Sequence, residues 1–187
     1  MKHALHVAVA EEIEQRLNGF GELIRDPACG GNQHLPLFIG PRRGRDTRMC
    51  LVDLIVVSAD KVRVIVEIEE SGFHPTKICG KFLQSALSTH FIHDSRPEPT
   101  VPYADSALFI QVLDGSKCLK QGTRKKLQAE LIERQIRSLL PLKGSTIEDY
   151  RLFFVSGVSD HAGLEAVGIA VREMLSPSTE LQPTLLR

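Results

Sequence analysis

Two neighbouring apolar runs, residues 49–57 and 61–69, carry acidic side chains at positions where a strand normally holds valine or isoleucine. Both runs are rich in β-branched residues, and only a short polar segment separates them, so we expect two strands joined as a hairpin. Asp53 interrupts the first run, and Glu67 and Glu69 interrupt the second. A carboxylate inside a buried strand is costly unless it is paired or bound to a cation. These three residues therefore constrain both the fold and the function.

The loop between the two strands determines whether the carboxylates meet. Side chains two residues apart on a strand share a face, so Glu67 and Glu69 point the same way. A three-residue loop, Ala59-Asp60-Lys61, places Asp53 directly across from Glu67 on that face, whereas a two-residue loop shifts the register and separates them. In the first register, which we adopt, three carboxylates converge. Like charges raise one another's pKa unless a cation holds them, and such oxygen ligands suit Mg²⁺, Mn²⁺ or Ca²⁺ rather than Zn²⁺.

A basic helix is expected directly after the hairpin. His74 and Pro75 mark its start, because proline is favoured at the first helical position. Polar side chains recur on one face at helical spacing, namely Lys77, Lys81, Gln84 and Ser88. Apolar side chains occupy the other face, so this helix should pack against the hairpin and present a lysine to the carboxylates.

An aspartate, a Glu-x-Glu sequence fourteen residues later and a lysine-bearing helix together resemble the PD-(D/E)XK nuclease superfamily, which has the restriction-endonuclease-like fold. In this resemblance Asp53 matches the motif Asp, and Glu67 matches the (D/E) position. Glu69 stands where the motif has Lys, which is a departure. Some restriction enzymes of this superfamily carry Glu there, and other members have moved the lysine onto the following helix, which nominates Lys77 or Lys81.

The resemblance implies a cofactor and a substrate as well as a fold. It covers the topology of roughly residues 1–115 and implies a nuclease that acts on DNA with Mg²⁺ or Mn²⁺ held by the three carboxylates. In this family a glutamate of the first helix often joins the metal site. Glu12 is the candidate here, with Glu11 and Glu14 as alternatives, and a solvated helix face also explains all three. Cutting both strands of a duplex commonly needs two active sites, so a homodimer is a further expectation.

The remaining chain alternates helices and strands. In order, we expect a helix over 2–18, a loop over 19–34, strands over 35–39, 49–57 and 61–69, the basic helix, a proline-rich connector over 93–105, a strand over 106–113, a turn over 115–122, a helix over 123–140, a strand over 150–156 and a helix over 161–175. This order predicts a single α/β domain over 1–175, with a restriction-endonuclease-like αβββαβ core, a mixed central sheet flanked by helices and a C-terminal αβα extension. The tail, 176–187, is expected to be loosely ordered.

Four arginines crowd the loop that leads into the strand carrying Asp53, at positions Arg42, Arg43, Arg45 and Arg48. Guanidinium groups bind phosphate oxygens in a two-pronged way, so this loop is a candidate DNA-backbone contact beside the carboxylates. The alternative interpretation is a solvated loop. Gln84, on the polar face of the basic helix, is a further candidate contact to DNA.

Charge and hydropathy exclude other classes of protein. The 23 basic residues balance 23 acidic ones, which argues against coating nucleic acid through bulk charge but allows a local patch. No apolar run approaches the ~18–20 residues needed to span a bilayer, so we expect no membrane contact and a cytoplasmic protein. The cysteines form no CxxC pair and the histidines no HExxH motif, so we expect buried, reduced thiols and no zinc site.

Three functional interpretations stay open at this point. The first is the metal-dependent nuclease. The second is a nuclease-like fold without catalysis that serves as a nucleic-acid or protein interaction module, as the missing motif Lys would suggest. The third is purely structural: Glu67 and Glu69 would lie at a sheet edge in water, with Lys61 and Arg63 as ion-pair partners.

Overall fold

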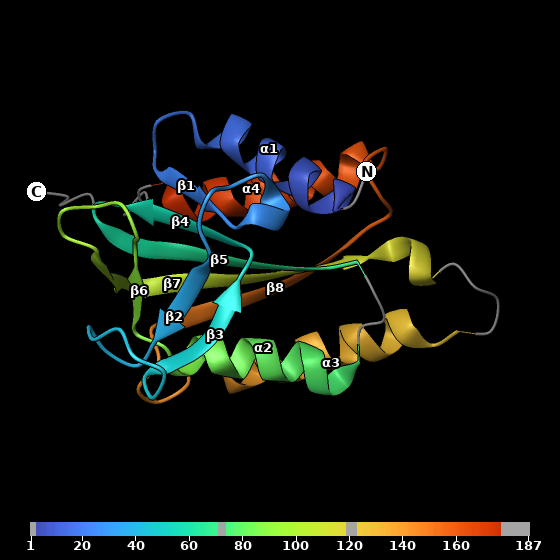
Figure 1. The fold of residues 1–187 in the computed structure, drawn as a ribbon. Helices are drawn as coiled ribbons and strands as arrows, with labels where there is room; N and C mark the ends of the chain where they lie inside the picture. Colours follow the sequence, from blue (N-terminus) through green and yellow to red (C-terminus); the bar gives the residue numbers. More distant parts are fainter. Residues whose placement is uncertain (1–2, 71–73, 119–122, 177–187) are drawn as a thin grey trace, which may run out of the picture.

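The computed structural model describes residues 3–70, 74–118 and 123–176, which form a β-structure covered by helices on both sides (Figure 1). The helices are α1 (Ala4–Leu17), α2 (Pro75–Leu87), α3 (Lys125–Leu139) and α4 (His161–Leu175), with short 3-10 turns η1 (Pro27–Cys29) and η2 (Gly115–Cys118). The strands are β1 (Glu22–Arg25), β2 (Leu35–Phe38), β3 (Arg48–Val52), β4 (Leu54–Ser58), β5 (Lys61–Glu69), β6 (His90–Ile92), β7 (Thr100–Asp114) and β8 (Ile147–Val155). The described chain is thus a mixed α/β structure with eight strands and four α-helices.

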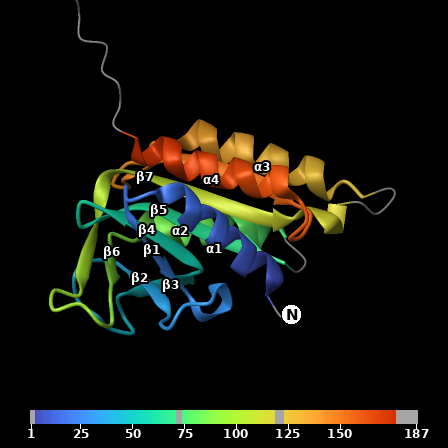
Figure 2. The same cartoon turned by 90° about the horizontal axis from the view of Figure 1, so that it is seen from above.

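The long strand β7 belongs to two sheets. Its C-terminal part lies in the main sheet, whose strand order is β1-β4-β5-β7-β8. There β1, β4 and β5 pair antiparallel, whereas β5, β7 and β8 are parallel. The N-terminal part of β7 pairs antiparallel with β6, which continues through β2 to β3 as a second, antiparallel sheet. Figure 2 shows this second sheet beside one end of the main sheet.

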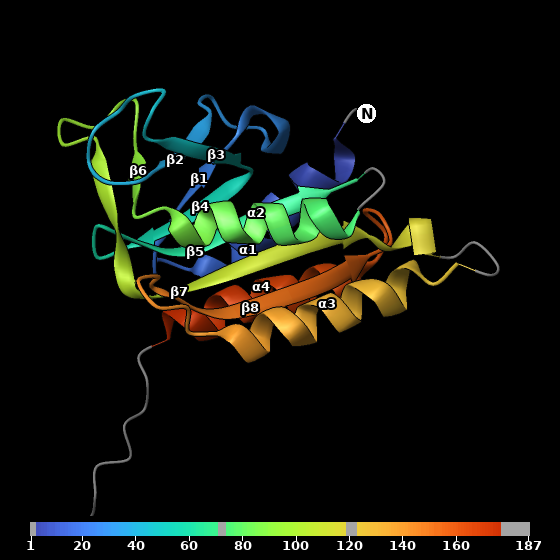
Figure 3. The ribbon, with the colours of Figure 1, turned by 90° about the horizontal axis from the view of Figure 1, so that it is seen from below.

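Alternating side chains of the main sheet face two helical layers. Helices α1 and α4 cover one face and α2 and α3 cover the other (Figures 1 and 3). Val64, Val66 and Ile68 of β5 pack in the cluster with α1 and α4, whereas Ile65 packs in the cluster with α2 and α3. Because side chains two residues apart share a face, Glu67, in phase with Ile65, belongs to the α2 side. The period-2 pattern of β5 therefore delivers its carboxylates to the lysine-bearing helix.

The strongest periodic segments match their predictions. Helix α1 and strand β5 lie where the sequence places them, and α1 ends at Asn18 and Gly19, both in the left-handed conformation that the Asn-Gly stop signal predicts. Helices α2, α3 and α4 also form over their predicted ranges to within a few residues. These segments carry buried stripes at helical or strand spacing, which is the signal that tertiary packing preserves.

Four expectations about strands are wrong. The run 49–57 is not one strand, because it breaks at Asp53 into β3 and β4. The predicted loop 19–34 contains β1, and β6 forms where no strand was expected. The connector 93–105 is shorter than predicted, because β7 begins at Thr100 rather than at residue 106. Short strands and strand extensions carry too few residues for a clear periodic signal.

Other expectations have separate outcomes. All four cysteines are free, but only Cys29 is fully buried and Cys79 is exposed, so the expectation of four buried thiols is wrong. None of the described helices combines the length and the apolar composition that crossing a membrane requires. The predicted tail lies outside the described residues apart from Ser176, as do residues 119–122 of the predicted turn.

Candidate active site

Asp53 lies at the point where the chain passes from the second sheet into the main sheet. Its carbonyl accepts a hydrogen bond from the Asp26 amide at 2.9 Å, and its amide donates to the Val66 carbonyl at 3.2 Å. Its side-chain Oδ2 accepts the Ile68 amide at 2.7 Å, an interaction that a backbone carbonyl would make in an uninterrupted ladder. The aspartate thereby breaks the strand that the sequence predicts as continuous. Burial raises the pKa of this carboxyl group, although the Ile68 bond opposes that shift.

The hairpin between β4 and β5 reaches the expected register by a different route. Its loop has two residues, Ala59 and Asp60, both at positive φ, so the predicted three-residue loop is wrong. A bulge then shifts the pairing by one residue, and Leu54 lies opposite Val66. The next position in this register brings Asp53 to the level of Glu67. The bulge compensates for the shorter loop, so Asp53 and Glu67 still lie at the same level at one end of the strand pair. The expected convergence of all three carboxylates is not met, because Asp53, Glu67 and Glu69 do not form a group whose ligand atoms lie within 4.8 Å of one another.

Two lysines of α2 pair with the carboxylates of β5. Glu67 is 2% exposed and Glu69 5%, so neither could remain charged without a partner. Lys81 Nζ donates to Glu67 Oε1 at 3.0 Å and to the Leu51 carbonyl at 3.2 Å, while Lys77 pairs with Glu69. Both lysines that the sequence nominates therefore lie at the site.

This pairing contradicts the purely structural interpretation. β5 lies between β4 and β7 rather than at a sheet edge. Lys61 pairs with Asp105 at 3.9 Å, and Arg63 donates to the Met174 carbonyl at 3.0 Å, so neither residue serves Glu67 or Glu69. The two glutamates belong to a buried, lysine-paired cluster instead.

Burial and like charge act together on Glu67. Burial raises the pKa of its carboxyl group to about 8, with a further contribution from the charge of Asp53, and Lys81 only partly offsets both. At neutral pH the folded chain therefore tends to hold a proton on Glu67. A multivalent cation shared with Asp53 would remove that tendency, because it stabilises the ionised form of both groups.

The α1 side chain that lies beside Asp53 is a histidine, not the expected glutamate. Glu12 pairs with Arg16 at 2.8 Å and packs against Gly168 of α4. His6, on the buried stripe of α1, instead places Nε2 3.8 Å from Asp53 Oδ1. The available sequence signal was a histidine three residues before Val9 on the apolar face of an amphipathic helix.

Sequence reasoning also missed Gln111 of β7. It lies beside Glu67 in the parallel register, is fully buried, and accepts a hydrogen bond from the Tyr150 hydroxyl at 2.8 Å. Its Nε2 has no hydrogen-bond partner among the described residues. Neighbouring strands are about 4.8 Å apart, so an amide donor lies next to the Glu67 carboxyl. The signal was a glutamine inside the apolar run 107–113.

Comparison with known proteins adds no relative. No family model, curated protein or solved structure matches this chain. The resemblance of Asp53 and Glu67-Ile68-Glu69 to a nuclease motif therefore stays a hypothesis, and the arrangement of side chains has to support the functional inference.

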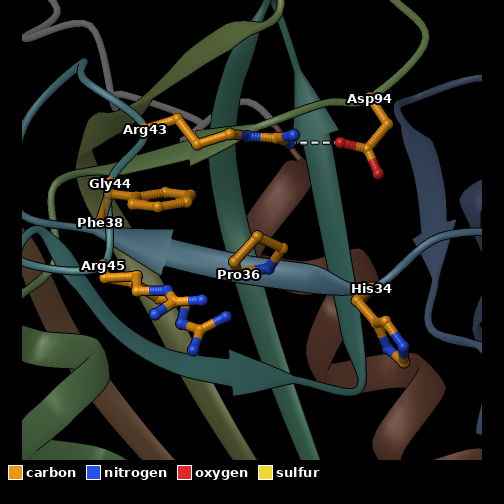
Figure 4. Close-up of a pocket in the computed structure, with 8 residues that line it drawn as sticks. His34, Pro36, Phe38, Arg43, Gly44, Arg45 and Asp94 are labelled. Carbon is orange, nitrogen blue, oxygen red and sulfur yellow. Dashed lines mark hydrogen bonds and ion pairs between the residues drawn. The ribbon is translucent and has the colours of Figure 1, made fainter.

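The arginine loop surrounds a separate hollow of about 350 Å³ on the second sheet (Figure 4). Two of its four arginines are engaged within the chain, because Arg42 pairs with Asp46 and Arg43 with Asp94. Arg45 and Arg48 line the hollow and are exposed, and neither has an ion-pair partner among the described residues. His34, Pro36 and Phe38 complete the lining, with Asp94 as its acidic member. The hollow thus offers two guanidinium groups to an anion.

The arginine hollow and the carboxylate cluster lie at opposite ends of β3. Arg48 begins this strand and Asp53 follows its last residue. Five residues at ~3.3 Å each separate them by about 17 Å. Gln84 is exposed on α2, one turn beyond Lys81.

Proposed function

We propose that this chain is a metal-dependent nuclease that hydrolyses DNA phosphodiester bonds. The observation that carries the proposal is the placement of Asp53 at the level of Glu67 at one end of the β4–β5 pair, with Glu69 two residues further along β5 and with Lys81 and Lys77 paired to the two glutamates. Buried carboxylates beside lysines are the groups that phosphodiester hydrolysis requires, since they hold cations and stabilise charge on the phosphate.

The connectivity supports the same proposal. Helix α1, the antiparallel strands β1, β4 and β5, helix α2 and the parallel strand β7 follow one another in the order αβββαβ that the resembled fold has. In this interpretation β2 and β3 are an insertion between β1 and β4, and β6 is an insertion between α2 and β7. The strand over 35–39, which the sequence predicts as one of the three core strands, belongs to the second sheet, and β1 takes its place. The β2–β3 insertion carries the arginine hollow.

Carboxylate oxygens are the ligands that a hard divalent cation prefers. Asp53 and Glu67 would hold Mg²⁺ or Mn²⁺, with Glu69 completing the set or orienting the attacking water. The bound ion would polarise the scissile phosphate and lower the pKa of that water. The raised pKa of Glu67 supports this fit, because a carboxyl group that is hard to ionise alone gains most from a cation.

Each lysine has a separate task in this proposal. Lys81 is held between Glu67 and the Leu51 carbonyl, so it is the better placed of the two to stabilise charge that develops on the phosphate. Lys77, whose side chain is 43% exposed, holds Glu69 in place. Arg45 and Arg48 would bind the DNA backbone away from the scissile bond. The length of about 17 Å along β3 between Arg48 and Asp53 corresponds to about five base pairs of duplex.

Plasmid cleavage tests the proposal. Wild-type protein should convert supercoiled plasmid to nicked or linear forms with Mg²⁺ or Mn²⁺, and Asp53→Asn should slow this conversion by about 10²-fold or more. Asp60→Asn is the matched control, because Asp60 lies in the exposed hairpin loop. Full activity of Asp53→Asn would reject the assigned roles.

The non-catalytic interaction module is the second candidate. It is favoured by Glu69, which stands on β5 where the motif has Lys. It is also favoured by the pairing of Lys77 with Glu69, which engages one of the two nominated lysines within the chain. Calorimetric titration with Mn²⁺ separates the two functions. A nuclease should bind the ion through Asp53 and Glu67, whereas a non-catalytic module has no need for it.

A further inference from the structure

A second group of metal-ligating side chains lies where α1 begins and β5 ends. His6 Nδ1 is 3.3 Å from Glu70 Oε1, and His3 Nδ1 is 3.8 Å from Glu70 Oε2. The two imidazole rings meet edge to face, with their centroids 5.2 Å apart. His3 and His6 are three residues apart, so the start of a helix brings both to the same side. The ligand atoms of all three residues lie within 4.8 Å of one another.

The Nδ1 atoms of both histidines are buried and face the Glu70 carboxylate without a hydrogen bond to it. The side chain of His6 is only 9% exposed, and the Nδ1 atoms of His3 and His6 have no hydrogen-bond partner among the described residues. Buried polar atoms in folded proteins almost always have a partner, so two orphaned ring nitrogens turned toward one carboxylate call for a ligand between them. Nothing in the nuclease proposal uses them.

The spacing suits a small, imidazole-binding metal ion. Ligand atoms about 2.0–2.2 Å from a tetrahedral Zn²⁺ lie about 3.3–3.6 Å from one another. The His6–Glu70 separation falls within that range, and the His3–Glu70 separation is slightly wider. His3 is 42% exposed, so rotation of its ring toward Glu70 meets little resistance.

We propose that His3, His6 and Glu70 form a binding site for a transition-metal ion of the Zn²⁺ class. Two imidazoles and one carboxylate favour Zn²⁺, Co²⁺ or Fe²⁺ over Mg²⁺ or Ca²⁺, in contrast to the all-carboxylate cluster nearby. Three protein ligands leave a fourth position for water. No zinc site was expected from the sequence, because the chain contains no HExxH motif and the third ligand, Glu70, directly follows a strand that is distant in sequence.

The surroundings orient the proposed ligands. A metal on His6 Nδ1 leaves Nε2 as the protonated nitrogen, and that atom faces Asp53 Oδ1 at 3.8 Å, as in a carboxylate–histidine–metal arrangement. Glu70 Oε1 also accepts a hydrogen bond from the Leu5 amide at 3.0 Å, which fixes the carboxylate against the first turn of α1. The ion would therefore fasten the start of α1 to the end of β5.

Calorimetric titration with Zn²⁺, together with the visible absorption of Co²⁺ as a geometry probe, tests the site. The informative variants are His3→Ala, at a partly exposed position, and Glu70→Gln, which keeps an oxygen for the Leu5 amide but removes the anionic ligand. His34→Ala is the matched histidine control, since His34 is exposed and pairs with Asp26. Glu67→Gln removes a ligand of the separate carboxylate cluster.

The expected result is one Zn²⁺ per chain in the wild type, in His34→Ala and in Glu67→Gln, with affinity reduced about 10-fold or more in His3→Ala and Glu70→Gln. Zn²⁺ should also raise the melting temperature of the wild type but not of those two variants. Absence of Zn²⁺ binding by the wild type would overturn the proposal. Zn²⁺ affinity in His3→Ala and Glu70→Gln equal to that of the wild type would overturn it as well. The test is independent of the nuclease proposal. Glu67→Gln should still bind Zn²⁺ at His3, His6 and Glu70 whether or not the chain cleaves DNA.

Discussion

At the scale of single residues, the centre of the candidate site holds a buried carboxyl group, that of Glu67, whose ionisation is unfavourable. Glu67 is almost fully buried beside Asp53, and Lys81 is its direct cationic partner. Burial raises the pKa of this carboxyl group from 4.5 to about 8 in the folded state. The folded chain therefore binds this proton more tightly than the unfolded chain does, and ionising Glu67 reduces stability.

This shift predicts a pH dependence of stability without divalent cations. The stabilising contribution is fully present below about pH 4.5 and is lost as pH rises toward 8, so the melting temperature should fall over that interval. Glu67→Gln should flatten the fall, because the amide does not titrate. Differential scanning calorimetry in a chelator at several pH values measures both effects. Equal slopes for the two proteins would contradict the assigned origin of the pH dependence.

A second residue-scale prediction separates the two lysines. Lys81 contacts Glu67 and the Leu51 carbonyl, whereas Lys77 contacts Glu69 from a more exposed position. Lys81→Gln should therefore reduce plasmid cleavage by about 10²-fold, and Lys77→Gln by less than about 10-fold. Circular dichroism would establish that both variants are folded. The reverse order of effects would assign the charge-stabilising role to Lys77.

At the scale of elements, the hairpin between β4 and β5 determines the geometry of the site. Ala59 and Asp60 both adopt the left-handed conformation at the two-residue loop. Asp, Asn and Gly tolerate this conformation, whereas it costs a residue such as Ala59 about 1–2 kcal/mol. The bulge near Arg63 then restores the pairing that brings Asp53 to Glu67.

Relief of this strain is measurable. Ala59→Asn should stabilise the protein by about 1 kcal/mol and raise the melting temperature by about 2–4 °C, because asparagine tolerates positive φ. The same change at Ala162, an exposed position in α4, should give no gain. A thermal melt of both variants makes the comparison, and an unchanged melting temperature for Ala59→Asn would show that the loop stores no such strain.

Elements whose residue pattern is set by burial were predictable from the sequence. Breaks and turns that depend on one side chain or on a short loop were not. The alternation in β5 and the helical spacing of α2 gave the carboxylates and both lysines of the site. The break at Asp53 depends on one side-chain bond to the Ile68 amide, and the loop Ala59-Asp60 lacks the Asn-Gly signal that marks a two-residue hairpin. His6 and Gln111 were missed because only the tertiary fold brings them beside Asp53 and Glu67.

At the scale of the whole molecule, charge is balanced but unevenly placed. Equal numbers of basic and acidic residues give no overall attraction to DNA, so the proposed DNA binding would have to come from a local patch. Arg45 and Arg48 in the hollow are the arginines of that loop without an intramolecular ion pair in the described chain. A homodimer stays a prediction, which light scattering on the purified chain would test.

The patch predicts a salt signature. Replacing Arg45 and Arg48 by alanine should weaken DNA binding and lower the slope of log affinity against log salt by about 1.8, since each phosphate contact contributes about 0.9. Arg134→Ala, an exposed arginine of α3, should leave the slope unchanged. Fluorescence anisotropy at several salt concentrations makes the measurement. An unaltered slope in the double variant would assign the hollow to another ligand.

Strand β7 has a consequence for the products of such an enzyme. One continuous strand takes part in both sheets, so the sheet that carries the guanidinium groups and the sheet that carries the carboxylates are joined by a shared backbone ladder. A protein of this build would act as a molecular ruler. If Arg45 and Arg48 bind a distinctive phosphate, such as the one at a strand terminus, cleavage should occur at a constant number of nucleotides from that phosphate. The sequence of the intervening bases should not change this distance.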